Sequence, residues 1–375
     1  MALKLETIKA ELDAVLLKAD PSWAPVRQAY WNRLQEVGLP KARGEAYTWV
    51  PLALLQNVNY ADQASQMAIP AIPKSMVQDW TALAQGETDF SALLPALLST
   101  SPIILDVPFL PDWQDIHFGA SNVYTHNIIN IPADAKVRLH WASSAPNNGF
   151  SSERLDLVVA EGAQVEVYEQ SDENLDQVSL RHTRIQIGSK ATVSWLGLDC
   201  GLKLNRSTID AHLAGAQASI QFRALSLLDS TASSHRRLQV FHEAPDCSSD
   251  QFVRHMLLGS SQASCASQVE IKKNITGSKA HQLINSLLLS REAKASAKPT
   301  LLIHNDEVVA SHGTTCGDLD TTQLFYLQSR GLSAPVARRV LVSAFVQSLF
   351  DAQASTQASK AIAVKAMATL ARRFQ

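Results

Sequence analysis

The spacing of apolar residues along this 375-residue chain changes twice, from helical to strand-like and back to helical. Near the start, Leu5, Ile8 and Leu12 recur at intervals of three and four, with charged residues between them. This spacing places apolar side chains on one face of an α-helix. We therefore expect a helical N-terminal region over residues 1–100, cut by prolines, with an extended connector at Ala68–Pro73.

From residue 101 to 317 the period is two, which is typical of β-strands. Leu155 and Leu157 precede a turn at Gly162, and the alternation resumes at Val165. Short strands separated by small turns therefore account for the middle of the chain.

The turns in this region recur regularly. The glycines at 162, 188 and 215 are 26 and 27 residues apart, and weaker copies occur at Gly259–Ala263 and Ser290–Ala293. Spacings in this range are typical of solenoids with one supersecondary unit per repeat. No helical pattern separates the turns, so βαβ crossovers are disfavoured. A β-helix and a β-sandwich remain, and the repeat favours the β-helix.

Residues 318–375 return to helical spacing. Asp320 and Gln323 have the spacing of a capping box, Leu324 begins an apolar face, and Gly331 stands where a C-terminal cap belongs.

A second helix is expected from Ser333 and Pro335 onward, and a third over Gln357–Arg373. The polar segment Ala352–Ser359 that leads into the third helix suggests a loosely attached end.

Composition and charge narrow the class of protein. The chain is 46% hydrophobic and 18% charged with a formal net charge of -2, which is typical of a soluble globular protein and gives no drive toward nucleic acid or an anionic membrane. Its four cysteines form no C-x-x-C pair, the charged N-terminus does not resemble a secretory signal, and no segment has about 20 apolar residues. These features predict a cytoplasmic protein that does not span a membrane.

The sequence lacks several catalytic motifs. Gly277-Ser278-Lys279 is not a complete phosphate-binding loop, and neither G-x-G-x-x-G after a strand nor H-E-x-x-H is present. The chain is therefore not expected to hydrolyse ATP by itself.

The densest group of reactive side chains lies in Ser311–Gly317. Cys316 with His312 could form a cysteine hydrolase, the same pair could supply two metal ligands, or His312 could be a hydrogen-bonded histidine in a turn before a helix. The residues alone leave these alternatives open.

Other reactive residues fit structural roles better. His242–Cys247 (HEAPDC) has the composition of a turn around Pro245, and Cys200 and Cys265 lie in strand-like runs where small buried residues are expected. Arg236 and Arg237 are expected on a solvated face.

The segment Gln282–Arg338 resembles the SufB/SufD family of iron-sulfur cluster assembly proteins, and most closely its SufD branch. The matching elements are Asn285–Ser290, Lys298-Pro299, Asp306–Gly313, Gly317 and Gln323–Gly331, with support from His242–Asp246 and from Glu45–Leu52 (EAYTWVPL). The resemblance implies a right-handed parallel β-helix flanked by helical N- and C-terminal regions, which agrees with the periodicity.

The resemblance also implies partners. SufB and SufD pair through their β-helices, and each C-terminal helical region holds SufC, an ABC-type ATPase. This implies a non-catalytic scaffold subunit of a cytoplasmic SufB-SufC-SufD complex, in which Leu324, Phe325, Tyr326 and Arg330 face SufC. An exposed β-helix edge would also allow a homodimer when the chain is isolated, and the sequence leaves monomer and homodimer open.

Two positions favour the SufD branch over SufB: Ile284 occupies the place of a SufB cysteine, and Gly313 that of a SufB glutamate. Ala310 departs from the SufD pattern, because it occupies the place of a cysteine that is frequent in SufD. His312 matches the SufD histidine and is the expected iron or cluster ligand at the SufB interface, whereas Cys316 is given no role.

The resemblance implies no tightly bound cofactor in this chain alone. A transient iron-sulfur cluster would be shared with SufB, and a flavin in the complex remains open. Three alternatives stand against this interpretation: a free-standing cysteine hydrolase using Cys316 and His312, a β-helix carbohydrate lyase, and a SufB-type homodimer.

Overall fold

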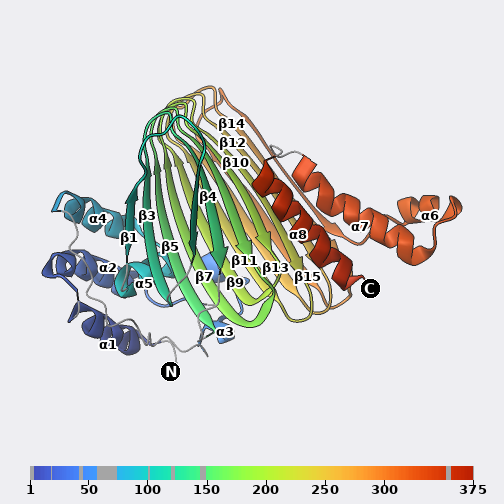
Figure 1. Ribbon diagram of the computed structural model, residues 1–375, viewed down its shortest axis with the longest axis horizontal. Coiled ribbons are helices and arrows are strands. Elements are labelled where there is room, and N and C mark those ends of the chain that lie inside the picture. The colour runs from blue at the N-terminus through green and yellow to red at the C-terminus, as the bar shows by residue number, and fades with distance from the viewer. Residues whose placement is uncertain are drawn as a thin grey trace.

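The computed structural model of the chain describes residues 4–17, 19–41, 45–56, 74–99, 102–119, 123–143, 149–351 and 356–374. Its centre is a parallel β-helix made of two eight-stranded sheets, with helices before and after it (Figure 1). Successive strands alternate between the sheets, and each strand pairs in parallel with the strand two places along the chain. The expected fold class is confirmed, while the Ala68–Pro73 connector lies outside the described residues.

We call the two sheets odd and even after their strand numbers. The odd sheet contains β1 (Ile103–Asp106), β3 (Tyr124–Ile131), β5 (Phe150–Val159), β7 (Asn174–Ile187), β9 (Leu202–Leu213), β11 (Ser233–His242), β13 (Gln262–Ile271) and β15 (Lys294–Ile303). The even sheet contains β2 (Gln114–Gly119), β4 (Lys136–Ser143), β6 (Gln164–Ser171), β8 (Thr192–Asp199), β10 (Ser219–Leu228), β12 (Ser248–Leu257), β14 (Lys279–Leu288) and β16 (Val309–Gly317).

One turn of each coil contains a residue with left-handed backbone geometry. These residues are Asp134, Gly162, Lys190, Gln217, Asp246 and Gly277, and the amide of each donates to a carbonyl in the same turn of the next coil. Gly188 and Gly215 lie two residues before this position, so the glycines that revealed the repeat are not all equivalent. The true repeat is the stacked turn, and glycine occupies its left-handed position in only two of these six coils.

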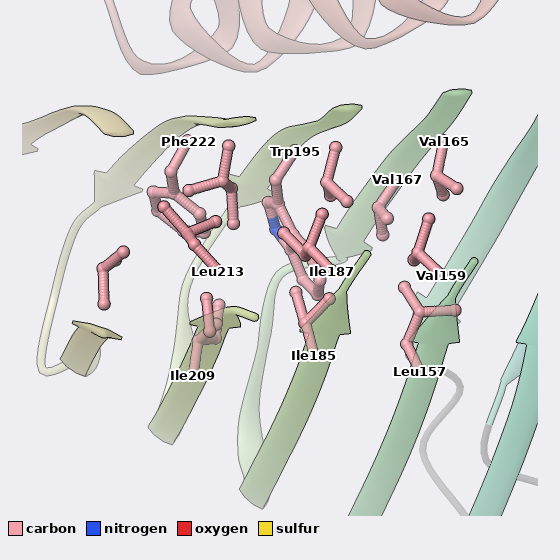
Figure 2. Close-up of a cluster of buried hydrophobic side chains, with 14 of the residues drawn as sticks. Leu157, Val159, Val165, Val167, Ile185, Ile187, Trp195, Ile209, Leu213 and Phe222 are labelled. Carbon is pink, nitrogen blue, oxygen red and sulfur yellow. The ribbon is translucent and has the colours of Figure 1, made fainter. Parts of the chain in front are cut away.

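Stacks of similar apolar side chains fill much of the β-helix interior (Figure 2). Val167, Trp195 and Phe222 are register partners on successive strands of the even sheet, and Val159, Ile187 and Leu213 are partners on the odd sheet. Because parallel strands in register point equivalent side chains to the same face, each coil extends the core of the previous one.

Charged groups lie inside the same cylinder. Glu169 accepts hydrogen bonds from Arg181 (2.8 Å), Arg236 (3.3 Å) and the Trp195 indole (3.1 Å). Burial acts to raise the pKa of Glu169, but Arg236 and Arg181 more than offset it, and the pKa lies below its usual value. The expectation that Arg236 is solvated is therefore wrong: its side chain is 4% exposed because it pairs with an internal carboxylate.

The N-terminal helices cover the outer face of the odd sheet (Figure 1). They are α1 (Leu5–Leu16), α2 (Ala24–Val37), α3 (Leu52–Gln56), α4 (Lys74–Gly86) and α5 (Phe90–Leu98), with short 3₁₀ helices at Pro21–Trp23 and Glu45–Tyr47. Helix α5 packs on β3, β5 and β7. At this interface Arg154 of β5 donates to Glu87 (2.8 Å) and to Asp156 (2.7 Å), so buried ion pairs fix the helices to the β-helix.

The C-terminal helices α6 (Thr321–Ser329), α7 (Ala334–Asp351) and α8 (Gln357–Arg373) follow the last strand, and α7 and α8 pack on the even sheet. The expectation of a loosely attached end is wrong for α8. Its N-terminal cap Thr356 hydrogen-bonds Tyr168, and Arg373 in its last turn donates to the carbonyl of Cys200 at 2.7 Å. Among the described residues, no helix has the length and apolar character needed to cross a membrane.

Candidate functional site at the open end of the β-helix

The last coil of the β-helix ends in two strands that each lack a neighbour on one side. β15 pairs with β13, β16 pairs with β14, and no further described strand continues either sheet. The apolar side chains of Leu302, Ile303 and Val309 are 40%, 37% and 69% exposed at this end. Free backbone groups next to apolar side chains are the properties of a surface on which another chain can add strands.

His312 lies on β16 at this open end, on the face directed toward the interior. The register pairs it with Gln282 of β14, which donates to Ser267 of the opposite sheet at 2.7 Å. Its neighbour Ser311 faces the other way, where Oγ hydrogen-bonds the exposed His281 at 2.8 Å. Because no described strand follows β16, the side chain of His312 is exposed although it faces inward.

His312 is not part of a larger group of metal-binding side chains among the described residues. Within the part of the chain that the structure describes, no group of three or more histidines, cysteines, aspartates or glutamates could hold a metal ion. A stable closed metal site generally needs about four ligands. The imidazole can therefore contribute one ligand, and the others would have to come from outside the described residues.

Cys316 is on the same inward face as His312 but four residues farther along the strand. At about 3.3 Å per residue this separates the two by about 13 Å, far beyond the hydrogen-bond contact of a nucleophile with its base. The geometry therefore does not support the cysteine hydrolase or a two-ligand metal site. Cys316 is exposed at the rim of a cleft of about 860 Å³ between β14, β16 and α7.

The other cysteines offer no alternative nucleophile. Cys200, Cys247 and Cys265 are buried, as expected for two of them, and burial raises the pKa of Cys265 to about 12. A thiol with a raised pKa is a poor nucleophile at neutral pH.

The region from β2 to α7 matches a family model described as "SUF system FeS cluster assembly, SufBD core domain" over residues 116–345. This match covers more than half of the chain. The chain belongs to the SufBD family.

Curated relatives carry names that agree with this family. The chain is 24% identical over 220 residues to the iron-sulfur cluster assembly protein SufD of Escherichia coli, covering 59% of this chain and 52% of the relative. It is 27% identical over 196 residues to an iron-sulfur cluster assembly SufBD family protein of Synechocystis sp., covering 52% and 43%. The chloroplastic protein ABCI7 of Arabidopsis thaliana is 28% identical over 194 residues, covering 51% and 40%. The chain thus spans about half the length of the curated relatives it matches.

The residues that separated SufD from SufB in the sequence lie around His312. Ile284 is 1% exposed in the apolar core, and its register partner on β16 is Thr314. Gly313 faces outward, where a Cβ atom would lie 3.3 Å from Leu283. The inward face near His312 therefore contains no thiol at position 284, and Gly313 supplies no carboxylate.

Two of the SufBD-like sequence elements have structural roles. Tyr47, in the Glu45–Leu52 element, donates to Asp89 at 2.7 Å. Burial acts to raise the pKa of Asp89, but Arg206 and other partners hold it well below its usual value. In the His242–Asp246 turn, His242 is buried and bonds Ser249 at 2.9 Å, which confirms a structural turn.

The helix α6 that was expected to face SufC is an exposed surface. It begins at Asp320, whose carboxylate accepts from the amides of Thr322 and Gln323 without the reciprocal bond of a capping box, and Gly331 follows its end with left-handed geometry. None of the residues of α6 is buried, so its expected apolar face is not covered.

The expected partner-binding residues lie on this surface. Phe325 and Tyr326 are 70% and 55% exposed, Arg330 stacks on Tyr326 at 5.2 Å, and Leu324 is half-buried.

Sequence reasoning missed the buried polar residues beneath His312. Gln251 and Gln282 are 1% and 0% exposed on the inward face of the even sheet. The available signal was a glutamine at an inward position of two consecutive coils, which becomes visible only once the register is known.

Proposed function

We propose that this chain is a SufD-type scaffold subunit of an iron-sulfur cluster assembly complex, in which His312 supplies one ligand to a cluster formed at the interface with a SufB-type homologue. The observation that supports this most is the placement of His312 on the inward face of the last, one-sided strand. A second β-helix that docked on this end would bring its own inward side chains next to His312.

The ligand set would then be divided between two chains. Imidazole is a borderline ligand for iron, whereas thiolates are the preferred ligands of iron-sulfur clusters. Since Ile284 and Ala310 replace the nearby thiols, the partner would supply the sulfur and any carboxylate ligands. The cluster is the cargo of the complex, and opening the interface would release it.

The strands at the open end support pairing with a homologue. A partner strand could hydrogen-bond along the free edges of β15 and β16, while apolar contacts would cover Leu302, Ile303 and Val309. The same surface explains a homodimer in isolation, which the SufB-type chain would replace in the complex.

Energy would come from a SufC-type ABC ATPase bound at the α6–α7 hairpin. The sequence has no phosphate-binding loop, and Phe325 and Tyr326 are large apolar groups without a cover among the described residues. Exposed aromatic residues on a projecting helix are typical interface anchors. We place the complex in the cytoplasm, with this subunit non-catalytic and a flavin as an optional further component.

Co-purification of the tagged full-length chain from its native cells tests the proposal, with mass spectrometry of the partners and assays of iron and sulfide. We expect a SufB-type homologue and an ABC ATPase, and we expect His312→Ala to lower the iron content without releasing the partners. The matched control is His281→Ala, because His281 is exposed near the same strand edge but faces outward. Wild-type cluster assembly by His312→Ala would refute the role of His312, and recovery of the chain alone would refute the complex.

A further inference from the structure

The residues beneath His312 form a continuous polar lane, which we define as Gln251, Gln282 and His312. The register pairs Gln251 of β12 with Gln282 of β14, and Gln282 with His312 of β16. All three therefore face the interior, on consecutive strands of the even sheet. Adjacent strands are about 4.8 Å apart, so each residue of the lane is the nearest inward neighbour of the next one across the sheet.

Ser267 on the odd sheet holds the two glutamines. The Nε2 atom of Gln282 donates to Ser267 Oγ at 2.7 Å, and Ser267 Oγ donates to Gln251 Oε1 at 2.5 Å. These hydrogen bonds fix the orientation of the Gln282 amide, with its nitrogen directed across the cylinder to Ser267.

The carbonyl oxygen of the same amide has no partner. Gln282 Oε1 is buried and accepts no hydrogen bond, although the side chain is 0% exposed. A buried acceptor left without a donor destabilises the folded state, so its retention needs an explanation. The next inward side chain toward the open end is His312, whose ring carries one N–H when neutral.

We propose that Gln282 is a positioning residue for His312: its Oε1 accepts the Nδ1–H of the imidazole and thereby directs the Nε2 lone pair toward the interface. The Nδ1 atom is the ring nitrogen nearer the backbone, and Nε2 is the nitrogen nearer the tip of the side chain. In metal-binding histidines, the hydrogen bond made by one nitrogen sets which nitrogen is free to bind the metal. This inference rests on the proposed function only in naming iron as the group that Nε2 would meet.

The test uses the full chain, free and in complex with its co-purified partners, and compares Gln282→Met, Gln282→Glu and Gln251→Met. Methionine keeps the unbranched shape but removes the acceptor, whereas glutamate keeps an acceptor oxygen. Gln251→Met is the matched control because Gln251 is equally buried in the same lane but one strand farther from His312. Circular dichroism and thermal unfolding identify any variant that has not folded.

The first measurement is the ¹⁵N spectrum of the imidazoles, with the His312 signals assigned from their loss in His312→Asn. In the wild type and in Gln282→Glu we expect His312 to carry its proton on Nδ1. Gln282→Met should move the proton population toward Nε2, and Gln251→Met should leave most of it on Nδ1. A tautomer unchanged by Gln282→Met, or changed equally by Gln251→Met, overturns the proposal.

The second measurement is the concentration of Fe²⁺ that half-saturates the complex. Loss of an outer hydrogen bond to a metal-binding histidine weakens metal affinity by about 10-fold to 100-fold, so Gln282→Met should weaken binding by about 10-fold or more and Gln282→Glu should restore it.

The two proposals fail separately in these experiments. If Gln282→Met shifts the tautomer while His312→Asn keeps full iron affinity, Gln282 positions a histidine that is not a ligand, and the ligand role in the proposed function is wrong. If His312→Asn loses iron while Gln282→Met changes neither tautomer nor affinity, the ligand role stands and the positioning role is wrong.

Discussion

The internal carboxylate Glu169 provides a direct test of how this β-helix holds charge in its core. We expect Glu169→Gln to lower the free energy of unfolding by about 3–5 kcal/mol. The substitution keeps the shape of the side chain but leaves Arg236, which is 4% exposed, without the carboxylate that pairs with it. Arg181 would retain only Glu153, whose nearest oxygen is 3.5 Å from its Nε atom.

The expected loss of unfolding free energy follows from the burial of the paired charges rather than from the number of ion pairs. Removing one partner of a buried pair leaves an uncompensated charge, whereas an exposed pair contributes at most about 1 kcal/mol. Asp13→Asn is the matched control, because Asp13 pairs with Lys9 at 2.6 Å but the two side chains are 57% and 41% exposed. We expect this control to change the free energy of unfolding by less than about 1 kcal/mol.

Equilibrium urea unfolding, followed by tryptophan fluorescence and circular dichroism, measures both variants. The fluorescence is informative because the Trp141 and Trp195 indoles donate to Glu153 and Glu169 within the same network. The double variant Glu169→Met with Arg236→Met should cost less than the sum of the single changes, since it removes both charges. A loss below about 1 kcal/mol for Glu169→Gln, or strict additivity in the double variant, would refute the reasoning.

Three further predictions concern pH, backbone geometry and the exposed hairpin. Burial lowers the pKa of His235, His242 and His255 to about 3, 4 and 3, so around pH 5.5 only the unfolded chain gains these protons. In urea unfolding, the free energy of unfolding should therefore fall by about 1.3 kcal/mol per histidine between pH 7.0 and pH 5.5, and His255→Asn should reduce that loss by one such share. Gly162→Ala should lower the free energy of unfolding by about 1–2 kcal/mol or more in the same assay, because φ is +70° and the new Cβ would lie 2.2 Å from an Asp134 oxygen. The control Gly86→Ala should not destabilise the chain. Phe325→Ala should leave the unfolding free energy within about 0.5 kcal/mol but reduce recovery of the ATPase partner; full recovery would contradict our placement of that surface.

The fold was largely predictable from the sequence because its repeat unit is local. Alternation of Leu155 and Leu157 before a turn describes one coil, and stacking a further coil on each side buries its inward positions. Glycine was a useful but incomplete marker, because Lys190 and Gln217 adopt the same left-handed geometry as Gly162. Periodicity could not predict where individual charged residues lie.

Arg236 illustrates that limit. Its strand alternates in the ordinary way, and an arginine in such a pattern is normally solvated. It is buried because Glu169, 67 positions earlier in the sequence, comes to within 3.3 Å across the cylinder. Such a pairing depends on the register of the two sheets, which no local pattern specifies.

The candidate site was located by resemblance, and the structure changes its interpretation. His312 and Cys316 look like a reactive pair in the sequence because only three residues separate them. In an extended strand that spacing places them on one face but about 13 Å apart, so proximity in sequence is not proximity in space. The same alternation places His312 and Gln282 side by side although they are 30 residues apart.

The arrangement at the open end has a consequence for where a cluster can form. Inside the cylinder many polar groups hydrogen-bond one another, as Ser267 does with the two glutamines. On β16, the inward polar side chain of His312 has no described strand above it. If His312 is a ligand, its ligand set would be incomplete in the free chain and would become enclosed once another chain covered this end. Cluster binding by His312 would therefore be coupled to assembly itself, because the ligand set and the dry environment would both be completed by the same docking event.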